Sequence, residues 1–144
     1  PPVFGACLEM LKSINCDLKD KQVFIIANSN IFGKTLAKVL ECRGAKAETV
    51  KATDKNLNKK IMKADILIAA VGKPKFIKKE MIKKDAVIID IGITKKGKKV
   101  FGDVDFEDVK DRAGYITPVP GGVGPLTIAM AFRNTVEIWG RRKK

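Results

Sequence analysis

The chain has 144 residues, of which 45% are hydrophobic and 6% aromatic, and its formal net charge is +13. This length and composition fit one aliphatic α/β domain and exclude two ordinary domains. The three cysteines form no CxxC pair and the chain has no histidine. We therefore expect neither a metal site nor a disulfide framework, and we expect a reducing, cytoplasmic setting.

The positive charge raises the question of nucleic-acid binding, because clustered Lys and Arg neutralise phosphates. Here the basic residues are spread between apolar runs, without interleaved aromatic residues, and the dense run at 141–144 fits a solvated tail. We therefore do not expect a nucleic-acid partner. No segment has the length of a membrane span, and the first residues, PPVFGACLEM, are no signal peptide. The missing initial Met indicates a trimmed sequence or a fragment.

The first half of the chain alternates helical and extended patterns. A helix is expected over GACLEMLKSI, residues 5–14, and a strand over the apolar run QVFIIA, residues 22–27. After the polar turn NSN, Leu36, Val39 and Leu40 fall at helical spacing, and Gly44 is a plausible C-cap. A second strand is expected at 45–50 and a second helix at 54–64.

The second half repeats the pattern. ADILIAAV, residues 64–71, hardly alternates and predicts a strand buried on both faces. Further expected elements are a short helical piece at 78–82, a strand at 85–93, a mobile loop at 95–100, a helix at 106–114 and a short strand at 115–117. Strands alternating with helices predict a Rossmann-like, open and mostly parallel α/β sheet with helices on both faces, in one domain over 1–144.

The segment PVPGGVGPLTIAM, residues 118–130, combines a loop rich in glycine and proline with a helix-like stretch. Glycines let a ligand approach the backbone, prolines stiffen the loop, and Pro125 suits a first helical turn. Two interpretations stay open: a plain connector, or a rigid surface for a ligand.

Ligands of such sheets bind at the carboxyl ends of the strands, near a topological switch point. The loops expected there are 27–33, 50–54, 71–75, 90–94 and, if 115–117 joins the sheet, 118–125. ANSNIFG, residues 27–33, takes the place of a dinucleotide fingerprint but lacks two of its glycines. Ser29 could help hold a phosphate at the helix N-terminus, or could simply cap the helix. Gly72 and Gly92 each have two interpretations: the glycine leaves space for a nucleotide, or it belongs to an ordinary turn.

No catalytic set emerges from these loops. Asp90 and Asp103 stand out among the carboxylates, but with no histidine and no lysine paired to a base, neither qualifies as a general acid or base. Aspartates at such positions are more often turn or cap residues. The pattern is typical of a binding protein.

Four segments together resemble one family, the bifunctional methylenetetrahydrofolate dehydrogenase/cyclohydrolases: ADILIAAVGKP (64–74), DAVIIDIGI (85–93), KVFGDVDFEDV (99–109) and ITPVPGGVGPLTIAMAFRNTVE (116–137). Their order and spacing match the family from residue 1 to about 138. The resemblance covers the family's C-terminal nicotinamide-cofactor domain only, with residues 1–16 as a junction helix. It implies an NAD(P)-binding domain of a folate enzyme that forms homodimers.

The family's catalytic Tyr-x-x-x-Lys pair, with its Gln and Asp partners, belongs to the N-terminal domain that this chain lacks. Tyr115 is the single tyrosine, and Val119 stands four residues after it. The resemblance therefore implies a chain that is inactive alone and shares its folate substrate with a catalytic half. The alternative is a stand-alone, inactive binding or scaffold module.

The resemblance also implies a role for individual residues. On the cofactor side these are Asn28, Ser29, Asn30, Gly33, Lys51, Asp54, Gly72, Lys73, Ile91, Gly92, Ile93 and Thr127. On the substrate side they are Pro120, Gly121, Gly122, Val123 and Gly124.

Two positions depart from the family pattern. Ala27, Asn28 and Ser29 stand where the family usually has Gly-Arg-Ser, and Lys51 and Ala52 stand where it often has His-Ser. The loss removes groups that would hold a 2′-phosphate through charge-assisted bonds, although Lys51 or Lys55 could act as point charges. The cofactor is therefore expected to be NADP or NAD, with a degraded 2′-phosphate site.

Overall fold

The computed structural model describes residues 1–142, so the last two residues of the basic run at 141–144 lie outside the described part. The helices are α1 (Pro2–Ser13), α2 (Asn30–Glu41), α3 (Leu57–Ile61), the 3-10 helix η1 (Lys79–Met81), α4 (Phe106–Val109) and α5 (Val123–Arg141). The strands are β1 (Gln22–Ala27), β2 (Lys46–Val50), β3 (Ile66–Ala70), β4 (Val87–Asp90), β5 (Thr94–Lys96), β6 (Lys99–Phe101) and β7 (Tyr115–Ile116).

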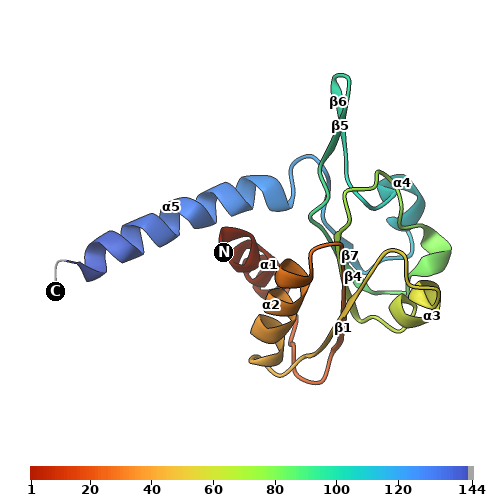
Figure 1. Ribbon diagram of the computed structural model, residues 1–144, viewed down its shortest axis with the longest axis horizontal. Helices are drawn as coiled ribbons and strands as arrows, with labels where there is room; N and C mark the ends of the chain where they lie inside the picture. The colour runs from red at the N-terminus through yellow and green to blue at the C-terminus, as the bar shows by residue number, and fades with distance from the viewer. Residues whose placement is uncertain (143–144) are drawn as a thin grey trace.

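Five strands form one parallel sheet in the order β2-β1-β3-β4-β7. The predicted parallel α/β sheet is therefore confirmed, including its short last strand. The register places Ile25 of β1 beside Thr49 of β2 on one side and beside Ile68 of β3 on the other. In Figure 1 the sheet stands in the middle of the domain, with α1 and α2 on one side of it and α3 and α4 on the other.

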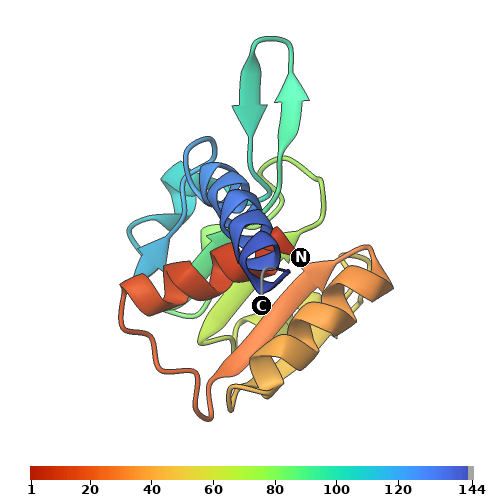
Figure 2. The same ribbon diagram turned by 90° about the vertical axis from the view of Figure 1, so that its left-hand side faces the viewer.

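The two faces of the sheet carry separate apolar cores. Val23 and Ile25 pack among side chains of α1, α2 and α5, whereas Phe24 and Ile26 pack among side chains of α3, η1 and α4. Successive side chains of a strand point to opposite faces of the sheet. Because helices cover both faces, a buried strand of this sheet is apolar at every position, as the run at 23–27 is. Figure 2 looks onto the face covered by α1, α2 and α5.

The chain leaves the carboxyl ends of β1 and β3 toward opposite sides of the sheet. After β1 it crosses to β2 at one edge, and after β3 it continues to β4 and β7 toward the other. The crevice between the ends of these two adjacent strands is therefore the topological switch point. The side-chain Nδ2 of Asn28 bridges the two loops there by donating to the backbone carbonyl of Val71 at 2.8 Å.

The segment 95–100, predicted as a loop, is a β-hairpin instead, whereas its mobility stays a prediction. Strands β5 and β6 form an antiparallel hairpin in which Thr94 pairs with Phe101, and it projects from the domain (Figure 1). Gly97 at its tip has a φ of +60°, a conformation that suits a tight hairpin turn. The strands were not predicted because this lysine-rich segment has almost no alternation of apolar and polar residues.

The predicted helices at 54–64 and 106–114 are shorter than expected. Only Leu57–Ile61 and Phe106–Val109 are α-helical, because their flanking residues form turns. Strand β4 likewise ends at Asp90, before the glycine at 92. No helix within residues 1–142 combines the length and the apolar character that crossing a membrane requires.

Candidate functional site

The loop after β1 ends in a capped helix. Ser29 has extended backbone angles, and its hydroxyl accepts a hydrogen bond from the amide of Phe32 at 3.2 Å. This confirms Ser29 as the N-cap of α2. The amides of Asn30 and Ile31 lie in the first turn, where no intrahelical acceptor is available, so the positive end of the helix dipole stays open toward the switch point.

Replacing Ser29 with alanine is expected to lower the free energy of unfolding by about 1 kcal/mol, because α2 loses its cap. Ser13, an exposed serine at the other end of a helix, donates to the carbonyl of Met10 and provides the matched control. Ser13→Ala is expected to change stability by less than about 0.5 kcal/mol. Urea denaturation of the two variants checks this, and equal losses would contradict the cap.

Gly33 lets α2 approach the sheet. A Cβ atom at this position would lie 2.4 Å from Cγ2 of Thr49 on β2, far inside van der Waals contact. Close packing of α2 on β2 therefore requires a residue without a side chain at position 33.

The loop after β2 contains Lys51 and Asp54. Asp54 accepts the Asn56 amide at 2.8 Å and pairs with Lys60 at 3.1 Å. That amide, followed by the Lys60 ammonium, holds the pKa of Asp54 below its usual range. Asp54 is thus engaged in its own loop, whereas Lys51 is exposed and has no ion pair among the described residues. Their contacts with a cofactor stay predictions.

The loop after β3 is tied to a distant carboxylate. The backbone amides of Val71, Gly72 and Lys73 all donate to Asp103, those of Gly72 and Lys73 at 3.0 and 2.8 Å. Gly72 has a φ of +73°, and a Cβ added there would meet no atom within 4 Å. Its surface is therefore open, but the amides of this loop are already occupied.

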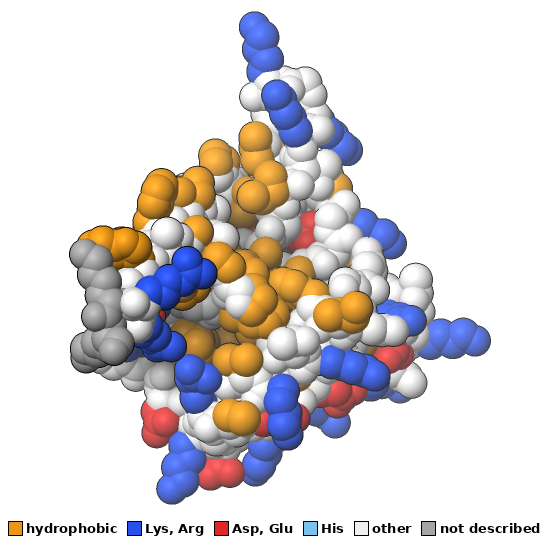
Figure 3. Space-filling model, turned by 60° about the vertical axis from the view of Figure 1, so that its left-hand side comes forward, with side chains coloured by type: hydrophobic (Ala, Val, Ile, Leu, Met, Phe, Trp, Pro, Cys, Tyr) orange, Lys and Arg blue, Asp and Glu red, His pale blue; other side chains and the backbone are white. Residues whose placement is uncertain are grey.

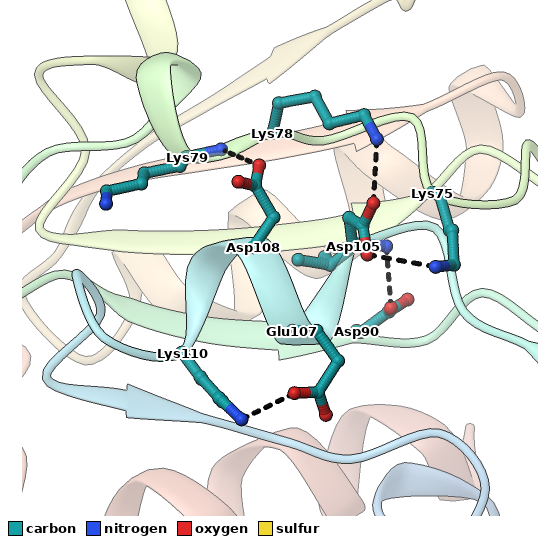
Figure 4. A network of polar contacts seen from close by, with 9 residues as sticks. Lys75, Lys78, Lys79, Asp90, Asp105, Glu107, Asp108 and Lys110 are labelled. Carbon is teal, nitrogen blue, oxygen red and sulfur yellow. Dashed lines mark hydrogen bonds and ion pairs between the residues drawn. The ribbon is translucent and has the colours of Figure 1, made fainter.

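The loop after β4 is held by a second carboxylate. Asp90 accepts the amides of Gly92 at 2.8 Å, Asp103 at 3.0 Å and Val104 at 2.8 Å. Asp90 is shown in Figure 4 beside the Lys75–Asp105 ion pair. Burial, and to a smaller extent the nearby Asp103 charge, raises the pKa of Asp90 to about 6 against the opposing effect of the three backbone amides.

Two glycines make room for this carboxylate pair. A Cβ at position 92 would lie 2.2 Å from Cγ of Asp103, and one at position 102 would lie 2.0 Å from Oδ2 of Asp90. Gly92 was predicted to lie beside a cofactor. The packing of Asp103 by itself explains why position 92 is a glycine. Asp90 does accept the amide two residues on, as turn aspartates do, but the sequence did not reveal the mutual packing. One sequence signal could have indicated this packing: each aspartate has a glycine close to it, in DIG at 90–92 and in GDV at 102–104.

The course of the glycine-rich loop at 118–124 depends on two of its glycines, and its contact with a ligand stays a prediction. Gly121 has a φ of +104°, and a Cβ on Gly122 would lie 2.4 Å from the carbonyl oxygen of Pro118, so the course of the loop requires both glycines. A Cβ on Gly124 would make only an ordinary contact, 3.9 Å from Cδ1 of Ile93. The bare backbone at Gly124 is thus not needed for packing.

Two hollows adjoin this loop. One, of about 150 Å³, lies between Ile91, Val100 and the segment 118–125. The other, of about 540 Å³, is lined by Val3, Ile91, Ile93, Val123, Gly124, Pro125, Thr127 and Ile128. Figure 3 shows hydrophobic side chains gathered around a hollowed face below the basic hairpin. The structure therefore brings Ile91, Ile93, Gly124 and Thr127 together, while the residues of the first loop line neither of these two hollows.

Residues 1–143 match the family model of the tetrahydrofolate dehydrogenase/cyclohydrolase NAD(P)-binding domain. The chain belongs to the tetrahydrofolate dehydrogenase/cyclohydrolase family. It is 46% identical over 139 residues to the bifunctional protein FolD of Mycoplasma capricolum, covering 95% of this chain and 49% of that protein. It is 48% identical over 132 residues to FolD of Moorella thermoacetica, covering 91% and 47%.

Solved structures of the tetrahydrofolate dehydrogenase/cyclohydrolase family share the fold. The Campylobacter jejuni FolD structure matches with a TM-score of 0.93 at 38% identity, over 99% of this chain and 51% of that one. The Trypanosoma brucei enzyme, solved in complex with NADP cofactor and an inhibitor, matches with a TM-score of 0.92 at 31% identity, over 100% and 52%. This chain thus spans about half the length of the curated relatives it matches.

The described residues fit the dinucleotide that the tetrahydrofolate dehydrogenase/cyclohydrolase family name implies. The open amides of α2 suit a phosphate group, and Gly72 leaves space beside the switch point. The larger hollow is mainly apolar, as a flat ring requires. Thr127 lines it, but its hydroxyl donates to the carbonyl of Val123 at 2.8 Å, so only its oxygen lone pairs remain for a ligand.

Proposed function

We propose that this chain is the cofactor-binding half of a methylenetetrahydrofolate dehydrogenase/cyclohydrolase and binds NADP or NAD along the carboxyl edge of its sheet. One observation carries the proposal. The switch point lies between β1 and β3, and the next strand, β4, is followed by the loop whose Ile91 and Ile93 line the apolar hollow. Family membership and the NADP complex of the Trypanosoma brucei relative support it.

The proposed contacts follow the edge in order. Asn28, Ser29, Asn30 and Gly33 lie at the phosphates, Lys51 and Asp54 at the adenosine ribose, and Gly72 and Lys73 at the adenosine. Ile91, Gly92, Ile93 and Thr127 face the nicotinamide, and Pro120, Gly121, Gly122, Val123 and Gly124 face the folate. The bound cofactor supplies a hydride acceptor. This chain's residues orient its ring and keep water from one side of it.

The catalytic residues are proposed to come from the other half of the relatives' length. Ile128, Phe132 and Val136 lie four residues apart on α5 and are 61%, 71% and 66% exposed, which is an apolar stripe suited to burial against a further domain. The chain alone is expected to form no NAD(P)H from methylenetetrahydrofolate and to hydrolyse no methenyl compound. Measurable turnover by the purified chain in a spectrophotometric assay would overturn this assignment.

Discrimination between NADP and NAD is expected to be weak, because Ala27, Asn28 and Ala52 offer no charge to a 2′-phosphate. Lys51 is the proposed remaining cation. Lys51→Ala is expected to weaken NADP binding about fivefold, the effect of roughly 1 kcal/mol for an exposed charge pair, and to leave NAD binding unchanged. Isothermal titration calorimetry with both cofactors checks this.

The matched control for Lys51 is Lys12→Ala, which removes the same charge from the end of α1. It is expected to change neither affinity. An equal loss in both lysine variants would show a general charge effect, and a wild-type preference for NADP above about 100-fold, or nearly 3 kcal/mol, would contradict a degraded 2′-phosphate site.

A cytoplasmic homodimer completes the proposal. Cys7, Cys16 and Cys42 are all free thiols, which suits a reducing compartment. Burial raises the pKa of the Cys7 thiol to about 12, so this thiol stays protonated and unreactive.

The proposed homodimer rests on the family resemblance. Sedimentation equilibrium of the purified chain tests it.

A further inference from the structure

Asp90 and Asp103 are buried side by side in the loops of the proposed site. Their residues are 3% and 0% exposed, and within residues 1–142 neither carboxylate has an ion pair. Burying two neighbouring acidic groups without a cation is costly. Within the part of the chain that the structure describes, the hydrogen-bond partners that offset this cost are backbone amides.

Those amides come from three separate segments. Asp103 binds the amides of Val71, Gly72 and Lys73, thirty to thirty-two residues away along the chain. Asp90 binds the amide of Gly92 in its own loop and those of Asp103 and Val104, which follow the hairpin. The loop after β3, the loop after β4 and the return from the hairpin are thereby joined through one carboxylate pair.

The glycine-rich loop is joined to the backbone of the same strand end. The backbone amide of Asp90 donates to the hydroxyl of Thr117 at 2.8 Å, one residue before Pro118. Asp90 also lines the smaller hollow together with Ile91 and the loop at 118–125. A shift of the Asp90 backbone would therefore disturb both walls of the hollow.

We propose that Asp90 and Asp103 are positioning residues whose carboxylates hold the loops after β3 and β4, and the return from the hairpin, in the geometry that receives the dinucleotide. This inference rests on the proposed function. Asp103 acts as an internal anion, because it occupies three amides that would otherwise attract a phosphate. The phosphates of a cofactor are thereby directed to the amides of α2, and Gly72 meets the cofactor through its open Cα.

The experiment combines amide hydrogen exchange with calorimetry on the full chain. Asp103→Asn keeps the side-chain shape but turns one acceptor oxygen into a donor. The amides of Val71, Gly72 and Lys73 are expected to lose protection by about tenfold or more, while amides in β1 and β2 keep theirs. The dissociation constant for NADP is expected to rise about tenfold or more. Asp90→Asn is expected to do the same to the amides of Gly92, Asp103 and Val104.

Asp65→Asn is the matched control. The Asp65 carboxylate also accepts a strand amide, that of Gln22 at 2.9 Å, but at the amino edge of the sheet, where it also pairs with Lys83. This variant is expected to lose stability and to keep cofactor affinity. Unchanged loop protection in Asp103→Asn, or an affinity loss no larger than that of Asp65→Asn at equal stability, would overturn the proposal.

The wild-type chain decides the matter if the variants do not fold. Its amides at Val71, Gly72 and Lys73 are expected to exchange as slowly as those of the neighbouring strands, and fast exchange there overturns the proposal. If the wild type binds neither NADP nor NAD, the proposed function fails, whereas the exchange data still test whether the carboxylates hold the loops.

Discussion

Gly92→Ala is expected to lower the free energy of unfolding by about 3–5 kcal/mol, among the largest losses for a single methyl group. The new Cβ would lie 2.2 Å from Cγ of Asp103, so the carboxylate must leave its position. The amides of Val71, Gly72 and Lys73 would then lose their acceptor, and of these bonds that of Val71 is buried, where an amide that water cannot reach costs about 1–3 kcal/mol.

Gly140→Ala is the matched control for this substitution. Gly140 lies in α5, and a Cβ there meets no atom within 4 Å. Alanine is a better helix former, so stability is expected to stay the same or rise by up to about 1 kcal/mol. Guanidinium denaturation of both variants gives the comparison. A loss below about 1 kcal/mol for Gly92→Ala would mean that the loops shift easily and that the carboxylate pair does not hold them.

The second large effect is the pH dependence that Asp90 gives to stability. Burial raises its pKa from 3.8 to about 6, so the folded state favours the protonated form. The stabilisation is fully present below the ordinary pKa and is lost as the pH rises through about 6. The shift corresponds to about 3 kcal/mol at 1.36 kcal/mol per pKa unit.

The measurement is the difference in unfolding free energy between the wild type and Asp90→Asn at several pH values. This difference is expected to shift against the wild type by about 2.4 kcal/mol between pH 4 and pH 7, most of the full effect, because the unfolded carboxyl is already partly ionised at pH 4. Asp54 and Asp105, whose pKa values are lowered by their hydrogen bonds, stabilise the fold in the opposite direction, but they are present in both proteins and cancel. A difference that is flat with pH, or that grows in favour of the wild type, would show that Asp90 is not buried as a carboxylate beside Asp103.

The regular elements could be predicted because their signals are local. QVFIIA and ADILIAAV are apolar over a strand's length, and Leu36, Val39 and Leu40 repeat at helical spacing. Strand β1 and helix α2 therefore lie close to where they were expected. The ends of α3, α4 and β4 were less predictable, because turns formed by neighbouring residues end these elements. The hairpin was missed because its lysines are exposed and carry no hydrophobic period.

The amino-acid sequence by itself determined an α/β domain, the order of its strands along the chain, and the loops that follow them, because hydrophobic periodicity acts over a few residues. Only the tertiary structure decided which strands are neighbours and what Asp90 and Asp103 do. Their partners lie up to thirty-two residues away, and their fit depends on the missing side chains of Gly92 and Gly102. Such contacts exist only after the sheet has brought the loops together, since no local pattern encodes which buried amides will face a carboxylate.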